Sequence, residues 1–326
     1  MSPTSPLHVV VTGCGETPHP IDSSLMRLFP NRGRATAATA VTTAAAATAV
    51  LAAGVSLLTA PTAGAFSVSL GPVATPVLPR CEPSIVIIVP GGGNSVDGTP
   101  ENLPVGGYTA DMGARVDQIG RSTSRTVSYN SGAFVARDYL DAAADATNQT
   151  RDLVRRTAAE CPGAKISLYG YSLGADAAAH VAAEIGRGNG PVSAERFGSG
   201  VFQANPYRGA ATAQGGTATP GTGILGDLSD SYGSVSDRIM DVCDRGDFTC
   251  DSDTWTGEVR ANREAFLGVS AREGYQGLTT IPGDQRRPLA FETLIGVLPG
   301  TWLHTNSYSA TGSFSRGEGF LRGHMG

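Results

Sequence analysis

The sequence predicts a three-layer α/β/α sandwich built around a mostly parallel central sheet. Short runs rich in β-branched residues alternate with longer helical patterns along the chain, as in parallel βαβ units. In addition, residues 165–185 read as a buried strand, a tight G-x-S-x-G turn and an alanine-rich helix. Such a turn is typical of a strand-to-helix corner at the carboxyl edge of an α/β sheet.

The individual elements follow from apolar periodicity. A first strand is expected at residues 84–89, where it ends in a glycine-rich turn at 90–94. Further strands are expected at residues 126–130, 165–169, 196–202 and 238–242, and helices at 137–160, 175–185, 257–268 and 288–298. A loop rich in glycine and threonine, at about 209–226, separates the last two strands.

The first 65 residues have the composition of a leader. Arginines between Met26 and Arg34 precede an uncharged stretch of Ala, Thr, Val and Leu, and Ala63-Gly64-Ala65 then forms an A-x-A cleavage site before Phe66. This pattern predicts a secretory signal peptide over residues 26–65, and therefore a secreted or cell-envelope protein. A retained membrane anchor is the competing interpretation, because the apolar stretch is long enough to span a bilayer.

The remainder of the chain suits one large domain. Residues 66–80 contain several prolines and are expected to form an extended arm. Residues 81–326 are expected to form the α/β domain, with an insertion at about 252–300 that could act as a lid or an acyl-chain wall.

Charge and composition exclude several classes of partner. The formal net charge is −5 and Lys165 is the only lysine, so no basic patch for nucleic acid is expected. The glycines at 91–93 lack the G-K-[ST] ending of a nucleotide-binding loop. No cofactor or metal is expected, and the protein is expected to be a monomer.

Four cysteines remain once the leader is removed, which suits a disulfide-bonded exported protein. Four cysteines allow three pairings. The favoured pairing is Cys81 with Cys161 and Cys243 with Cys250, because Cys81 and Cys161 each precede a predicted core strand. Neighbouring parallel strands that start on the same edge would bring these two cysteines together. The spacing is wrong for a zinc site, since there is no C-x-x-C pair.

Ser172 is the predicted nucleophile. It occupies the centre of the G-x-S-x-G turn, where Gly170 and Gly174 let the flanking backbones approach closely. The helix that follows would direct its free N–H groups and positive end toward the site.

A serine nucleophile of this kind requires a histidine within hydrogen-bonding distance of Ser172 as its base. Four of the five histidines are unsuitable: His8, His19, His180 and His324. The first two fall in the leader, the third lies about 12 Å further along the predicted nucleophile helix, and the last lies near the end of the chain, where fraying is expected. His304 therefore remains as the predicted base.

The acid is expected between Ser172 and His304 in chain order. Asp247 lies between Cys243 and Cys250, just after a predicted strand, and a disulfide across that loop would hold its carboxylate still. Asp244 and Asp251 are the other candidates. The same acidic loop could be a weak calcium site, although it lacks the EF-hand glycine and spacing.

These motifs together resemble the cutinase family, and most closely its actinobacterial secreted serine esterases. The resemblance covers about residues 81–310 and rests on Cys161-Pro162, on the G-Y-S-L-G-A run at 170–175, on C-x-x-x-D-x-x-C at 243–250, and on a later histidine with Tyr308 close behind. It implies an α/β hydrolase fold, a triad of Ser172, Asp247 and His304, and the favoured disulfide pairing.

Three departures from the family pattern concern the oxyanion hole and the insertion. Leu173 replaces the usual glutamine, but its N–H can still donate to an oxyanion. The glycine-rich turn at 90–94 replaces a hydroxyl residue, so the Gly92 N–H is the expected second donor and Gly93 the alternative. Finally, 57 positions separate Asp247 from His304, more than in compact members of the family.

The sequence thus predicts a secreted serine esterase that hydrolyses lipid, polyester or cell-envelope acyl esters through an acyl-enzyme. Two alternatives stay open. An acyltransferase of the mycolyl type would use the same triad with a sugar hydroxyl as acceptor, and a non-catalytic envelope-binding protein would need no triad.

Overall fold

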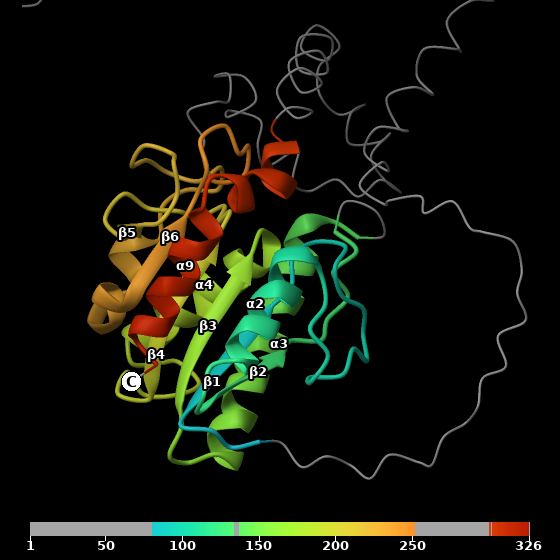
Figure 1. Cartoon of the computed structure of the whole chain (residues 1–326), viewed down its shortest axis with the longest axis vertical. Helices are drawn as coiled ribbons and strands as arrows, with labels where there is room; N and C mark the ends of the chain where they lie inside the picture. The colour runs from blue at the N-terminus through green and yellow to red at the C-terminus, as the bar shows by residue number, and fades with distance from the viewer. Residues whose placement is uncertain (1–79, 134–136, 252–299, 301, 326) are drawn as a thin grey trace, which may run out of the picture. The chain divides into compact units, whose positions relative to one another are not determined.

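A six-stranded sheet forms the centre of the computed structural model, which describes residues 80–133, 137–251, 300 and 302–325 (Figure 1). The strand order is β2-β1-β3-β4-β6-β5, and each neighbouring pair is parallel. The strands are β1 (Ser84–Val89), β2 (Ser122–Thr126), β3 (Lys165–Tyr171), β4 (Phe197–Gln203), β5 (Ala213–Gln214) and β6 (Ile239–Val242). The labelled helices are α2 (Gly107–Asp117), α3 (Tyr139–Glu160), α4 (Leu173–Gly186) and α9 (Ser313–Gly323), with 3₁₀ turns η1 (Ser229–Ser231) and η2 (Gly233–Arg238); residues 302–310 are also helical.

Helices cover both faces of the sheet, and each face has its own apolar core. Along β1, Ile85, Ile87 and Val89 pack with α3 and α4, whereas Val86 and Ile88 pack with α2 and α9. This alternation is the two-residue period of a strand buried on both faces. In Figure 1, α2 and α9 lie in front of the sheet and α3 and α4 behind it. The three-layer α/β/α fold expected from the sequence is confirmed.

Two parts of the element prediction were wrong. The second strand lies at Ser122–Thr126 rather than at 126–130, although the Val127 amide still donates to the Ile88 carbonyl just beyond its end (2.9 Å). Helices α2 and α9 were not predicted at all. The expected fraying at His324 is also corrected, because α9 reaches Gly323 and the His324 ring contacts the Phe320 carbonyl (2.8 Å).

The described residues form two disulfides. Cys81 pairs with Cys161 and Cys243 with Cys250, which is the pairing that the sequence favoured. Strands β1 and β3 begin side by side, with Ser84 opposite Lys165, so the two cysteines that precede these strands meet at the amino edge of the sheet.

The predicted leader, the proline-rich arm and the insertion with its two expected helices lie outside the described residues, apart from Arg80 and Gly300. Among the helices of the described residues, none is long and apolar enough to cross a membrane.

Candidate active site

Ser172 stands at a sharp corner between β3 and α4. Its backbone has φ 56° and ψ −123°, a region that non-glycine residues seldom adopt and that is found at functional sites. The Ser172 amide donates to the Gln203 carbonyl at the end of β4 (2.9 Å). The corner is thereby fixed to the neighbouring strand at the carboxyl edge of the sheet, and the side chain is left half-buried.

The two glycines of the motif are required by close backbone contacts. A Cβ on Gly170 would lie 2.3 Å from the Gly174 carbonyl oxygen, and a Cβ on Gly174 would lie 2.1 Å from the Val89 carbonyl oxygen. Both distances are far shorter than a van der Waals contact, so α4 can approach β1 and β3 this closely only without side chains at these positions. The corner therefore has the geometry of a nucleophile elbow.

His304 lies on a helical segment, residues 302–310, and its ring contacts Ser172 through Nε2. The distance from His304 Nε2 to Ser172 Oγ is 2.9 Å. The ring stacks on that of Tyr171, with centroids 5.0 Å apart, and the Tyr171 hydroxyl donates to the His304 carbonyl (2.8 Å). The residue before the nucleophile thus supports both the ring and the backbone of the histidine.

Asp247 completes the line of contacts. His304 Nδ1 lies 3.0 Å from Asp247 Oδ1 and 2.9 Å from Oδ2. The carboxylate also accepts hydrogen bonds from the Thr249 amide (2.8 Å) and the Tyr308 hydroxyl (2.6 Å). It is fully buried, inside the loop that the Cys243–Cys250 disulfide closes. The loop therefore presents the carboxylate in one orientation.

The surroundings of Asp247 favour its charged form. Burial by itself would raise the pKa of this carboxyl, but attraction to His304 and the hydrogen bonds from His304, Tyr308 and the Thr249 amide outweigh it, so the pKa lies below its ordinary value. An aspartate that stays ionised next to the imidazole can hold the Nδ1–H tautomer and stabilise an imidazolium.

The candidate oxyanion donors lie on either side of the corner. Leu173 is the first residue of α4, so its N–H has no acceptor within the helix. The turn at 90–94 lies against the corner, since a Cβ on Gly91 would approach the Tyr171 ring to 2.8 Å. Of its two candidate amides, that of Gly93 donates to the Ser131 carbonyl (2.6 Å). The geometry therefore favours Gly92.

The other acidic candidates have structural contacts instead. Asp244 accepts hydrogen bonds from the side chains of Thr311 (2.7 Å) and Ser313 (2.5 Å), which tie its loop to the start of α9. Asp251 accepts from the Gly246 amide (2.9 Å). His180 is bound to Asp176 on its own helix (2.8 Å). None of these three has a described contact with Ser172 or His304.

Tyr171, Thr249 and Tyr308 were not predicted to contact the acid and the histidine. The signal for Tyr308 is its spacing from His304: the two are four residues apart, and on a helix such residues share a face. This spacing indicates a contact only if residues 302–310 are helical, and no helix was predicted there.

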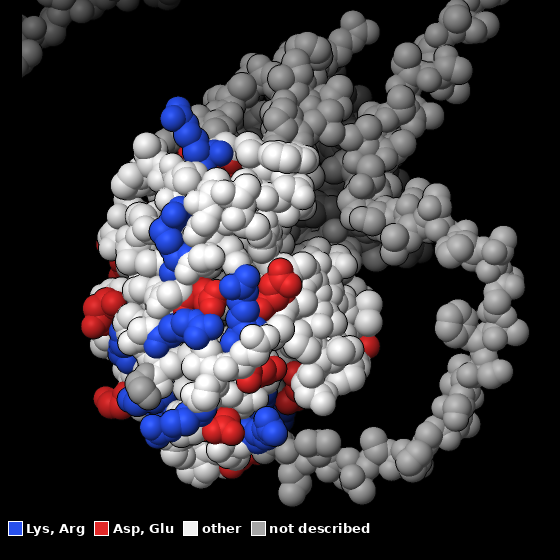
Figure 2. Space-filling model, viewed as in Figure 1, with Lys and Arg blue, Asp and Glu red and all other residues white. Residues whose placement is uncertain are grey.

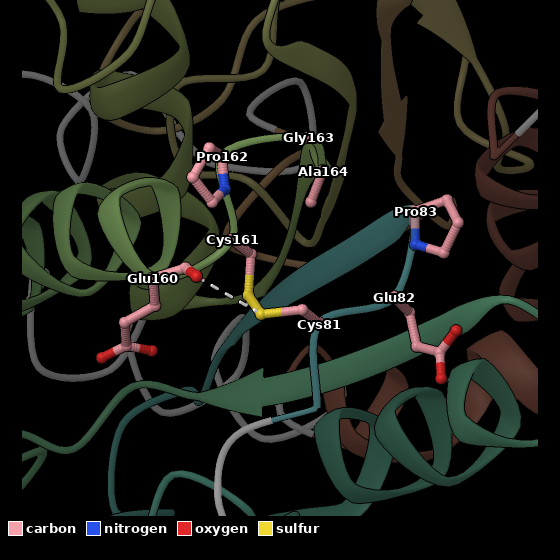
Figure 3. Close-up of a pocket in the computed structure, with 8 residues that line it drawn as sticks. All are labelled: Cys81, Glu82, Pro83, Glu160, Cys161, Pro162, Gly163 and Ala164. Atoms are coloured by element: carbon pink, nitrogen blue, oxygen red, sulfur yellow. Dashed lines mark hydrogen bonds between the residues drawn. A yellow bond between two sulfur atoms is a disulfide. The ribbon is translucent and has the colours of Figure 1, made fainter.

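No metal site is evident in the part of the chain that is described, where no three His, Cys, Asp or Glu side chains are grouped to bind an ion. A shallow hollow of about 320 Å³ surrounds the Cys81–Cys161 disulfide and is lined by residues 81–83 and 160–164 (Figure 3). It lies where β1 and β3 begin, at the opposite edge from Ser172. On the face shown in Figure 2, acidic and basic side chains are interspersed.

The fold and the Ser172–His304–Asp247 arrangement define the class as an α/β hydrolase. A model of the family described as Cutinase matches residues 97–259, which is half of the chain. The chain therefore belongs to the cutinase family and is a carboxylic ester hydrolase. The resemblance inferred from the sequence motifs is confirmed.

Several solved structures are similar to this chain. An acetylxylan esterase is 14% identical, with 76% of this chain and 100% of that chain covered and a TM-score of 0.45. A cutinase-like protein from Cryptococcus sp. is 16% identical, with 71% and 94% covered and a TM-score of 0.40. Lysin B from Mycobacteriophage D29 is 19% identical, with 74% and 100% covered and a TM-score of 0.47. A comparison with curated proteins found no match.

Proposed function

We propose that this protein is a secreted serine esterase in which Ser172 is the nucleophile, His304 the general base and Asp247 the orienting acid. The observation that supports it is one continuous line of short contacts: 2.9 Å from Ser172 Oγ to His304 Nε2 and 2.9 Å from His304 Nδ1 to Asp247 Oδ2. Each distance is within hydrogen-bonding range, as proton transfer requires.

In the acylation step, His304 Nε2 takes the proton of Ser172 while Oγ attacks the ester carbonyl carbon. The carbonyl oxygen becomes an oxyanion, for which the Leu173 and Gly92 amides are the proposed donors. Collapse of this intermediate breaks the carbon–oxygen bond of the ester, and the leaving alkoxide takes the proton from His304 and departs as an alcohol.

In the deacylation step, a water gives a proton to His304 Nε2 and attacks the acyl-enzyme carbonyl. The second tetrahedral intermediate uses the same two amides. When it collapses, Ser172 leaves with the proton held by His304 and the carboxylic acid is released. The buried Asp247 carboxylate favours the imidazolium that forms in each half of the reaction.

The proposed substrates are acyl esters of lipids, of polyesters or of the cell envelope. A sugar hydroxyl in place of water would turn the same acyl-enzyme into an acyltransferase. Comparing hydrolysis with transfer to a carbohydrate acceptor measures which reaction dominates, and we expect hydrolysis.

Secretion is the second part of the proposal. It is supported by the two disulfides, which form and persist in oxidising compartments, and by the signal-peptide pattern of residues 26–65. Mass spectrometry of the exported protein is expected to find Phe66 at the amino terminus. A cell-associated protein that retains residues 26–65 would contradict this.

Steady-state hydrolysis of a soluble p-nitrophenyl ester tests the role of Ser172. Ser172→Ala is expected to lose about 10⁴-fold or more in kcat, whereas Ser236→Ala, at an exposed serine of η2, is expected to match the wild type. Near-wild-type hydrolysis by Ser172→Ala would refute the proposed mechanism.

A further inference from the structure

Within the described ranges of the chain, there are two clusters in which a buried aspartate binds both a tyrosine hydroxyl and a histidine. In one, Asp176 Oδ2 accepts from the Tyr139 hydroxyl (2.8 Å) and Asp176 Oδ1 lies 2.8 Å from His180 Nδ1. In the other, Asp247 binds Tyr308 and His304. Only one of these clusters extends to the nucleophile, so the pair offers a natural comparison of the same contacts in and out of the site.

The two clusters differ in how the carboxylate is shared. Tyr139 and His180 bind different oxygens of Asp176. In contrast, Asp247 Oδ2 is approached both by the Tyr308 hydroxyl (2.6 Å) and by His304 Nδ1 (2.9 Å). Tyr308 therefore donates to one of the two carboxylate oxygens that His304 Nδ1 contacts, the other being Oδ1 at 3.0 Å, and a change in this hydrogen bond acts directly on the histidine proton.

The Tyr308 hydroxyl is suited to act as a permanent donor. The residue is fully buried, and burial together with the Asp247 charge raises the pKa of the phenol well above its ordinary value. It therefore keeps its proton at neutral pH, where Asp247 is ionised. Because His304 and Tyr308 are one helical turn apart, their two bonds to Asp247 also fix the rotation of residues 302–310 against the loop at 243–250.

We propose that Tyr308 is a positioning residue of the esterase, whose hydroxyl holds the Asp247 carboxylate and moderates its pull on the His304 proton. This inference rests on the proposed function of the triad. A hydrogen bond to an ionised oxygen disperses part of its charge, so loss of the Tyr308 hydroxyl leaves a carboxylate that attracts the imidazolium proton more strongly. His304 then loses its proton only at higher pH.

Other titratable groups of the described residues also face this pair. They are Tyr171 from β3, Tyr108 from α2 and Ser172 at the corner. Asp244 and Asp251 are joined to Asp247 by backbone hydrogen bonds within the loop. The ring of Phe314 on helix α9 packs against Tyr108. Unlike His304, which contacts both Asp247 and Ser172, Tyr308 donates a hydrogen bond to Asp247 and has no described contact with Ser172.

The test compares Tyr308→Phe with Tyr139→Phe, which removes the matching tyrosine-to-aspartate bond outside the site. In Tyr308→Phe, the midpoint of the acid limb of the pH profile of kcat/KM is expected to shift to higher pH by about half a pH unit or more. This shift corresponds to a change of about threefold in the proton affinity of His304. It is expected to stay in place in Tyr139→Phe. A purely structural role would lower the thermal midpoint of both variants and move neither limb, and that result would overturn the proposal.

Two further measurements keep this test decisive. An NMR titration of the His304 ring needs no substrate, so an unchanged midpoint in Tyr308→Phe refutes the inference even if the protein hydrolyses nothing. If the wild-type protein does not hydrolyse esters, that result would instead count against the proposed function. If Tyr308→Phe does not fold, 3-fluorotyrosine at position 308 retains the hydroxyl and makes it a stronger donor, and it is expected to move the acid limb down. A limb that stays in place or moves up would overturn the proposal.

Discussion

At the scale of single residues, the backbone of Ser172 is held in a rare conformation by contacts that leave no room for side chains on its neighbours. The closest of these involves Gly174, whose hydrogen faces the carbonyl oxygens of Val89 and Pro90. Because both are backbone atoms of the central strand and its end, neither can move aside without distorting the sheet. The position of Ser172, the proposed nucleophile, thus depends on a glycine two residues away.

Gly174→Ala is accordingly expected to destabilise the fold by about 2 kcal/mol or more, since overpacking against backbone cannot relax, and to lower esterase activity. Gly163→Ala is the control, because a Cβ there meets nothing within 4 Å, and a change of less than about 0.5 kcal/mol is expected. Urea denaturation followed by circular dichroism measures both. Equal free energies of unfolding would contradict the close approach of α4 and β1.

The lowered pKa of Asp247 predicts how the stability of the fold depends on pH. Its folded pKa lies below the unfolded value, so the stabilisation from its ionised form is present above the unfolded pKa and is lost as the pH falls through the folded pKa. The free energy of unfolding of the wild type is therefore expected to exceed that of Asp247→Asn most at neutral pH, with the gap closing below about pH 4. Urea titrations between pH 7 and pH 3 measure it. A gap that widens in acid would contradict the sign.

Among the structural elements, the two disulfides are expected to differ in their effects on stability and on activity. One joins the start of β1 to the end of α3 over 80 residues, and the other closes a seven-residue interval around Asp247. By loop entropy, removing the first is expected to cost about 4 kcal/mol and removing the second about 2 kcal/mol. For esterase activity the larger loss is expected from removing the second disulfide, because it closes the loop that contains Asp247, the proposed acid.

Paired Cys→Ala variants of each disulfide test this contrast, with thermal unfolding and ester hydrolysis measured on the same samples. The Cys243/Cys250 variant is expected to retain more stability and less activity than the Cys81/Cys161 variant. Activity that falls in proportion to stability in both variants would contradict a positioning role for the short loop.

The elements that the sequence revealed are those with strong apolar patterns. Strands β1, β3, β4 and β6 and helices α3 and α4 were predicted within a few residues. Strand β2 was displaced because its sequence, STSRT, is polar; it lies at the edge of the sheet, and its side chains bond to α2 and α3, as Ser122 does to the Val116 carbonyl (2.7 Å) and Arg125 to Glu160 (2.5 Å).

Helix α9 was missed because glycines weaken its helical signal. One of them has a packing reason: a Cβ on Gly317 would lie 3.1 Å from Val201 and 3.2 Å from Val242. The helix therefore lies closer to the sheet than side chains there would allow. Local propensity gives no sign of such a contact, which only the folded chain shows.

The candidate site residues were predicted from three signals in the sequence. The G-x-S-x-G corner, the cysteine-bounded acid and the elimination of other histidines led to Ser172, Asp247 and His304, and the structure brings these three together. The tyrosines were missed because their contacts join segments over 130 positions apart for Tyr171 and His304, and 61 for Tyr308 and Asp247. No local pattern records such contacts.

In the whole molecule, polar groups lie together at the carboxyl edge of the parallel sheet. The pKa values of two buried carboxyl groups there, Asp241 and Asp247, shift in opposite directions. Asp241 on β6 accepts from Asn205 Nδ2 (2.8 Å) and Thr212 Oγ1 (2.6 Å), which joins the segments that follow β4 to the sheet. Burial nevertheless raises the pKa of Asp241 to about 6, whereas that of Asp247 is lowered.

Asp241 is therefore expected to make the fold less stable as the pH rises. The folded chain holds a proton that the unfolded chain releases above about pH 4, so stability falls between about pH 4 and 6, by up to about 3 kcal/mol. In Asp241→Asn this slope is expected to disappear, so the wild-type free energy of unfolding declines relative to the variant from pH 4 to pH 7. Parallel slopes in urea titrations would contradict the shift.

We propose that Ser172 is an activated nucleophile at the carboxyl edge of this sheet. Treating the mature, disulfide-intact protein with a fluorophosphonate probe, beside Ser172→Ala, and locating the labelled peptide by mass spectrometry tests it directly. We predict a single phosphonylated serine at position 172 and no labelling of the variant. A folded protein that stays unlabelled, or that is labelled equally after Ser172→Ala, would contradict the account.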